Sequence, residues 1–116
     1  MKMVSLFYCF VCFVILQAAV WFSTNLQFVN ASFADKSFLV MIILSIPTSM
    51  TAYYGSKFGY SAFEESVWAI RFFGFAVSYL VFPLLTWYFL GESMLNIKTM
   101  SCVVLSFLII LIQVYF

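Results

Sequence analysis

The sequence predicts an all-α integral membrane protein: four transmembrane helices, packed as a helical bundle with short loops. Its composition is the first reason, since 66% of the 116 residues are hydrophobic and 8% are charged. Ordinary soluble domains have about 45–50% and about 25%. The second reason is the spacing of the charges, which leave uncharged stretches at 3–34, 37–56, 72–91 and 99–116. Each stretch is about as long as the roughly 20 helical residues that cross a ~30 Å hydrocarbon core.

We therefore expect spans at about 4–24, 37–56, 66–90 and 99–116, within a single transmembrane domain of residues 1–116. Apolar runs such as residues 107–112 do not alternate in the way that membrane strands do. The pairs Trp21-Phe22, Tyr53-Tyr54 and Trp87-Tyr88 close predicted spans, as an aromatic belt at the membrane surface would. In the last connection, Gly91 suits a helix C-cap and Asn96 suits the start of the next helix. Four spans place both termini on one side of the membrane.

Composition also excludes several kinds of chemistry. The net charge of +1 gives no basic surface for nucleic acid, and the absence of His removes the commonest acid–base group and metal ligand. Cys9 and Cys12 form a C-x-x-C, but inside an apolar span, where a reactive thiolate is disfavoured. We interpret them as small buried side chains. We expect no enzymatic activity, no metal site, no cofactor and no nucleic-acid partner.

Small side chains recur every three or four residues in three of the spans, a spacing that lets helices pack closely in lipid. The predicted packing residues are Ser45, Ser49 and Ala52 in the second span, Gly74 and Ser78 in the third, and Cys102 and Ser106 in the fourth. Alternatively, the Ser/Thr face around Thr48 lines a polar pathway, beside the kink expected at Pro47. Four short helices enclose little space, so both interpretations predict a homo-oligomer, such as a dimer, in the lipid bilayer.

Ionisable groups at a membrane span are candidates for function because they are costly there. Glu64, Glu65 and Arg71 stand at the entrance to the third span, with Trp68 on the helical face that Glu64 and Arg71 would share. Arg71 either extends to the lipid headgroups or forms a charged vestibule, in which Glu64 or Glu65 binds a cation or proton. Gln17 is the mid-membrane polar group of the first span. The predicted substrate or ion pathway comprises Gln17, Thr48, Glu64, Glu65, Trp68 and Arg71.

Residues 84–92, Leu-Leu-Thr-Trp-Tyr-Phe-Leu-Gly-Glu, precede a short loop and a final apolar helix. This segment resembles the end of a drug/metabolite transporter domain. The four-span size, Gly59-Tyr60-Ser61-Ala62 and Trp68 are similar to the small multidrug resistance proteins of that superfamily. The resemblance implies a dimer that moves a lipophilic cation or small polar metabolite by alternating access, coupled to protons. Multidrug members of the family use a Glu in the first span, where this sequence has Gln17-Ala18-Ala19.

Two functions from different classes follow. The first is a small transporter that moves a small cation or polar metabolite as an oligomer. The second is a non-transporting subunit that packs in a larger membrane complex. The absence of an acid from the first span and the 16 Phe residues, which offer a broad contact surface, favour the second. Both predict a multi-pass protein, which we expect in the inner or plasma membrane of a cell.

Overall fold

The computed structural model describes residues 3–29, 32, 35–93 and 95–115, and of residues 114 and 115 the backbone alone. These residues form four long α-helices: α1 (Met3–Val29), α3 (Ser37–Ala62), α4 (Val67–Leu90) and α5 (Ile97–Tyr115). The prediction of an all-α chain with four helices is therefore confirmed. By length and hydropathy α1, α3 and α4 are each able to cross a membrane, whereas α5 is a shorter apolar helix.

Two helices end later than predicted. α1 continues to Val29 rather than 24, and α3 continues to Ala62 rather than 56. The prediction ends each of these two spans where a polar or charged residue appears, but such a residue need not end a helix. The hydroxyl of Ser23 donates to the carbonyl of Ala19 at 2.7 Å, so a polar side chain is satisfied by the turn before it. Lys is itself a good helix former, so Lys57 continues α3.

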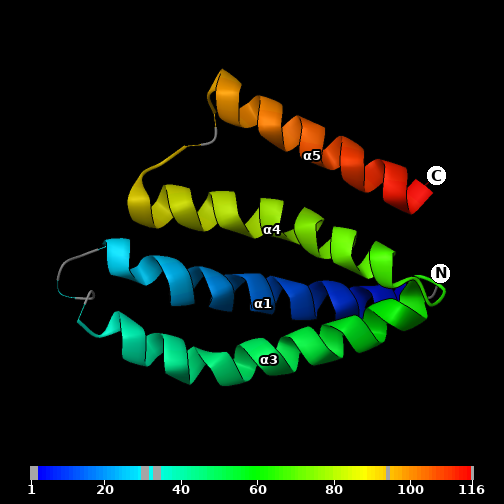
Figure 1. Ribbon diagram of the computed structural model, residues 1–116, viewed down its shortest axis with the longest axis horizontal. Helices are drawn as coiled ribbons and strands as arrows, with labels where there is room; N and C mark the ends of the chain where they lie inside the picture. The colour runs from blue at the N-terminus through cyan, green and yellow to red at the C-terminus, as the bar shows by residue number, and fades with distance from the viewer. Residues whose placement is uncertain (1–2, 30–31, 33–34, 94, 116) are drawn as a thin grey trace.

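The four helices lie side by side in one layer, in the order α3, α1, α4, α5 (Figure 1). The molecule measures 46 × 36 × 18 Å, and its shortest dimension is less than two stacked layers of helices, each about 10–12 Å across, would need. Neighbouring helices run antiparallel, and the start of α1 and the end of α5 lie at the same end (Figure 1). α1 contacts both α3 and α4, whereas α5 packs on α4.

The closest helix contact joins α1 to α3 through two glycines. A Cβ placed on Gly55 would lie 2.6 Å from Cε1 of Phe13, and one on Gly59 would lie 3.1 Å from Sγ of Cys9. Both partner side chains are buried, and Cys9 is 0% exposed. This G-x-x-x-G spacing allows the two backbones to approach closely. The interpretation of Cys9 as a small buried side chain agrees with this contact.

A buried hydrogen bond joins α1 to α4 near their other ends. The indole Nε1–H of Trp21 donates to Oγ1 of Thr86 at 2.9 Å, and the two side chains are 2% and 6% exposed. Trp21 is therefore buried between α1 and α4, where it also contacts Phe89, and is not exposed on the outside of the layer as a residue of an aromatic belt would be. Trp87 and Tyr88, at the end of α4, are exposed as a belt requires.

The predicted helix caps hold. Gly91 ends α4 with a φ of 72°, and its N–H donates to the carbonyl of Trp87 at 3.1 Å. Asn96 starts α5, where its Oδ1 accepts from the N–H of Thr99 at 2.8 Å. At the other end of α4, Ser66 accepts from the N–H of Ala69 at 3.1 Å. These caps fix where α4 begins and ends.

We expect Thr86→Val to lower the free energy of unfolding by about 0.6–2 kcal/mol, because the buried Trp21 N–H loses its acceptor. Thr86→Ser keeps the hydroxyl and should stay within about 0.5 kcal/mol of the parent. Unfolding in mixed detergent micelles, followed by circular dichroism, measures both. Equal stability of the Val and Ser variants would show that the hydrogen bond contributes nothing.

We expect Gly55→Ala to destabilise the chain by about 1–3 kcal/mol, since the new methyl group would overlap the buried Phe13 ring. Gly74→Ala is a matched control, because its Cβ would lie 3.7 Å from the same ring, at ordinary contact distance. The same unfolding assay compares them. A Gly74→Ala variant that is less stable than Gly55→Ala would contradict the α1–α3 contact.

Candidate functional site

A cavity of about 220 Å³ lies over α1, between α3 and α4, and has three polar or charged residues among a mainly apolar lining. Phe13, Leu16 and Gln17 of α1 contribute to it, as do Ala52 and Ser56 of α3 and Ile70, Arg71, Gly74 and Phe75 of α4. We call this cavity the Arg71 groove. Its position follows from the layer, since α3 and α4 flank α1 and contact each other only slightly.

A wider and more open depression of about 740 Å³ adjoins the groove. Its lining residues are Ala52, Tyr53, Ser56, Lys57 and Tyr60 of α3 and Val67 and Ile70 of α4. Ala52, Ser56 and Ile70 line both cavities. We call this second cavity the outer depression. The two cavities therefore adjoin each other on the α3–α4 side of the layer.

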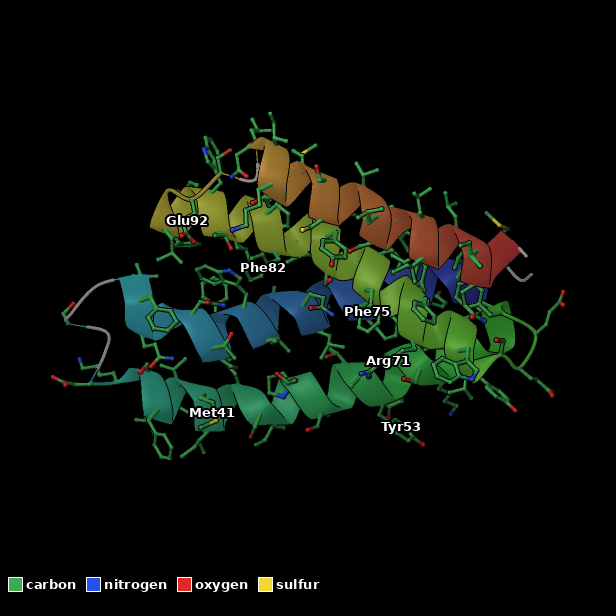
Figure 2. The ribbon with its side chains drawn as sticks, turned by 45° about the horizontal axis from the view of Figure 1, so that its top comes forward. Met41, Tyr53, Arg71, Phe75, Phe82 and Glu92 are labelled. Carbon is green, nitrogen blue, oxygen red and sulfur yellow. The ribbon has the colours of Figure 1, made fainter. Side chains whose placement is uncertain are left out.

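Arg71 is the charged residue of the groove. Figure 2 shows its side chain extending from α4 toward α3, and its guanidinium carbon lies 5.2 Å from the centre of the Phe75 ring. Such a cation–π contact is worth about 0.5–1 kcal/mol at an exposed site. Within the part of the chain that the structure describes, Arg71 forms no ion pair. Its charge is therefore available to a ligand, a lipid or a second chain.

The predicted pathway residues do not all converge in a single chain. Gln17 and Arg71 line the same groove. Thr48 lies on α3 outside the groove lining, and its buried Oγ1 has no hydrogen-bond partner among the described residues. Trp68 is 68% exposed and stacks on Phe72, with the ring centres 6.1 Å apart.

Glu64 and Glu65 lie in the turn between α3 and α4 and not in the groove. Both are exposed, with φ angles of 56° and 68°. The N–H of Glu65 donates to the carbonyl of Tyr60 at 2.8 Å, which is the hydrogen bond of a Schellman helix end. Gly usually occupies the left-handed position there, because a side chain is strained in that conformation.

The charge of the two cavities is therefore positive. Lys57 lines the outer depression, Arg71 lines the groove, and among the described residues no acidic side chain lines either one. The expected vestibule, in which Glu64 or Glu65 binds a cation beside Arg71, is not assembled in these cavities. Their charge favours an anionic or neutral polar group.

The predicted packing residues divide between inner and outer faces. Ala52 lines both cavities, and a Cβ on Gly74 would contact Phe13. Ser106 lies 2.9 Å from the hydroxyl of Tyr79, which links α5 to α4. The remaining predicted residues are exposed or bonded within their own helix: Ser45, Ser49, Ser78 and Cys102. Their role in contacts between chains stays a prediction.

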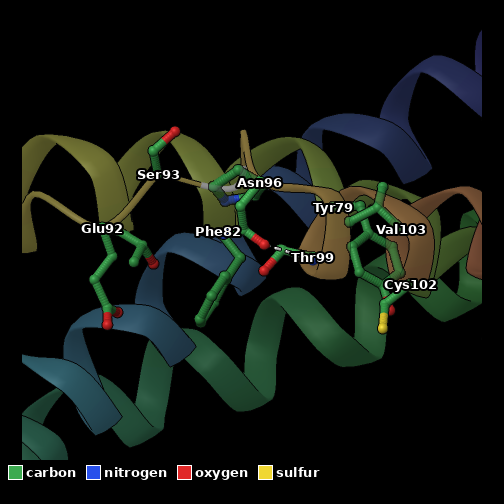
Figure 3. A pocket seen from close by; sticks show the side chains of 10 residues that line it. Tyr79, Phe82, Glu92, Ser93, Asn96, Thr99, Cys102 and Val103 are labelled. Carbon is green, nitrogen blue, oxygen red and sulfur yellow. Dashed lines mark hydrogen bonds between the residues drawn. The ribbon is translucent and has the colours of Figure 1, made fainter.

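A third cavity, of about 520 Å³, lies between α4 and α5 at the turn that joins them (Figure 3). Sequence analysis did not identify it, because its polar residues come from the turn and from both helices. Several of these groups already have structural partners. Ser93 accepts from the N–H of Leu95 at 3.0 Å, Asn96 caps α5, and Thr86 accepts from Trp21. Glu92 lines the cavity but is exposed.

We expect Glu65→Gly to raise the free energy of unfolding by about 0.5–1 kcal/mol, because Gly adopts a φ of 68° without strain. Glu65→Gln removes the charge but keeps the strained backbone, so it should leave stability unchanged. Comparing the two variants in the micelle unfolding assay separates backbone strain from charge. Destabilisation by Glu65→Gly would contradict this assignment of the turn.

Comparisons with protein-family models, with curated proteins and with solved structures give no match to this chain. They provide no support for the resemblance to small multidrug resistance proteins and no argument against it.

Proposed function

We propose that this chain is a multi-pass membrane protein in which α5 crosses the bilayer together with α1, α3 and α4. The 19 residues of α5 extend about 28 Å at 1.5 Å per residue, close to the ~30 Å hydrocarbon thickness. Large apolar side chains cover the outside of the layer, for example Phe38, Ile46, Leu84 and Leu105. Water would not stabilise so much exposed apolar surface, whereas lipid chains would. The inner or plasma membrane of a cell remains our proposed location.

The function that the geometry supports best is transport of a small polar solute by an oligomer of this chain. The observation that carries the proposal is the Arg71 groove, which places Gln17, Ser56 and Arg71 beside one cavity between apolar helices. Polar and charged groups in such helices typically mark a substrate path. Because the molecule is one layer thick, the groove needs a second chain to enclose it, and a homodimer would do so.

The positive charge of the groove narrows the proposed substrate class. A guanidinium donates to carboxylate or phosphate oxygens, and the amide of Gln17 donates and accepts hydrogen bonds. We therefore propose a neutral or anionic polar metabolite in preference to the small cation of the sequence-based hypothesis. Proton coupling through an acid in the first span is not part of this proposal, since α1 has no acidic residue.

The second candidate function is that of a non-transporting subunit in a larger membrane complex. One specific observation favours it: among the described helices α5 contacts α4 alone, so its other faces are available to a partner. The exposed apolar side chains of α3 and α5 would serve such a partner equally well. Both functions require another protein chain beside this layer.

We expect purified protein in liposomes to move radiolabelled solutes from a panel of sugars, amino acids, carboxylates and phosphate esters. Arg71→Gln and Gln17→Leu should each lower flux about tenfold or more, because hydrogen bonds to the solute are lost. Lys98→Gln is the control, since Lys98 is an exposed residue of α5 that lines neither cavity. Full flux in Arg71→Gln would contradict the groove as the path. Two results together would favour the second function: the folded protein shows no flux, and it co-purifies with a larger partner in a fixed stoichiometry.

A further inference from the structure

We propose that Lys57 and Arg71 together bind the phosphate group of an anionic phospholipid, whose headgroup occupies the outer depression. The two cations lie at the same depth. Lys57 precedes the end of α3 at Ala62 by five residues, and Arg71 follows the start of α4 at Val67 by four. At 1.5 Å per residue they lie about 7.5 Å and about 6 Å from the same turn.

This depth matches the edge of the hydrocarbon core of a bilayer. The 24 residues of α4 extend about 36 Å and the 26 residues of α3 about 39 Å, so each exceeds a ~30 Å hydrocarbon core by a few ångströms at both ends. The Cα atoms of Lys57 and Arg71 then lie about 3 Å inside the hydrocarbon boundary. Side chains of this length reach the phosphate layer from that position.

The charge of the two cations is complementary to that of a phosphate. Lys57 and Arg71 form no ion pair within the part of the chain that the structure describes, and the residues lining both cavities include no acid. Glu64 and Glu65 lie beyond the ends of α3 and α4, in the exposed turn. A guanidinium on α4 and an ammonium on α3 line adjoining cavities that share Ala52, Ser56 and Ile70. A phosphate placed where these cavities adjoin would offer oxygens to both cations.

The remaining walls distinguish a lipid from free phosphate. The outer depression is lined mainly by apolar and aromatic side chains, including Val67, Ile70, Tyr53 and Tyr60. At about 740 Å³ it is much larger than a phosphate ion, and it opens on the outside of the layer. Tyr53 and Tyr60 are exposed there, as aromatic residues at the headgroup level commonly are. The glycerol and the first acyl carbons of a phospholipid could pack against these apolar and aromatic walls, whereas a free phosphate ion has no apolar part to do so.

Lipid binding at these cations does not require the proposed transport, because a non-transporting subunit would present the same two cations. In a transporter, the lipid phosphate and the solute would compete for Arg71. Lipid binding at this site also differs from general attraction of basic residues to anionic membranes. The chain carries a second pair of exposed cations. Lys36 lies at the start of α3, the end opposite to Lys57, and Lys98 lies at the start of α5. These two residues line neither cavity, so they provide a control with the same change in net charge.

The test is native mass spectrometry of the full-length protein released from detergent in the presence of phosphatidylglycerol or phosphatidylcholine. We expect a retained phosphatidylglycerol, and an apparent affinity at least tenfold weaker in the Lys57→Gln/Arg71→Gln double variant. The Lys36→Gln/Lys98→Gln double variant should bind as the parent does. Equal weakening in both double variants, or equal retention of phosphatidylcholine, would overturn the proposal. Full displacement of the lipid by inorganic phosphate would overturn the choice of a lipid ligand.

A second measurement uses the unchanged sequence and so does not depend on folding of the variants. Vesicles that contain a photoactivatable phosphatidylglycerol should label peptides of α3 and α4 that border the outer depression, and the unlabelled anionic lipid should compete. Labelling that is equally strong around Lys36 and Lys98 would contradict a specific site. Circular dichroism of the double variants confirms that a loss of lipid is not a loss of helix.

Discussion

The close contact between α1 and α3 determines where the other helices lie. Gly55 and Gly59 bring the α3 backbone against Phe13 and Cys9, and the opposite side of α1 then remains for α4. α5 in turn depends on α4, which it contacts through Tyr79 and Ser106. In lipid there is little hydrophobic drive between helices, so packing of this kind and interhelical hydrogen bonds hold them together. The Arg71 groove exists because α3 and α4 stand on either side of α1.

The number and type of the helices could be predicted because hydropathy and the spacing of the charges show which segments are apolar and long enough to cross a membrane as helices. The contact faces could not, and α3 illustrates why. Its sequence places small residues on more than one face, including Ser45 and Ser49 as well as Gly55 and Gly59. Spacing alone does not say which face meets α1. The choice depends on Phe13, whose buried ring fits only where a side chain is absent.

The candidate site could be predicted only in part, again for a local reason. Placing Glu64 and Arg71 on one face, seven residues apart, assumes that a helix runs through both. Instead α3 ends at Ala62, α4 starts at Val67, and Glu64 and Glu65 take left-handed backbone angles in between. The turn therefore removes the carboxylates from the face of Arg71. Gln17 needed no such assumption, since it lies in the middle of a continuous helix, and it does line the groove.

The net charge is +1, but the positive and negative residues are unevenly distributed over the structure. The two adjoining cavities between α3 and α4 carry Lys57 and Arg71, and their lining includes no acid in the part of the chain that the structure describes. A cation near hydrocarbon is costly unless an oxygen-rich group neutralises it or water reaches it. A single layer of helices cannot supply that group from another of its own faces. Any solute, lipid or second chain that covers this side of the layer and excludes water must therefore bring hydrogen-bond acceptors to Arg71, and this requirement is common to both candidate functions.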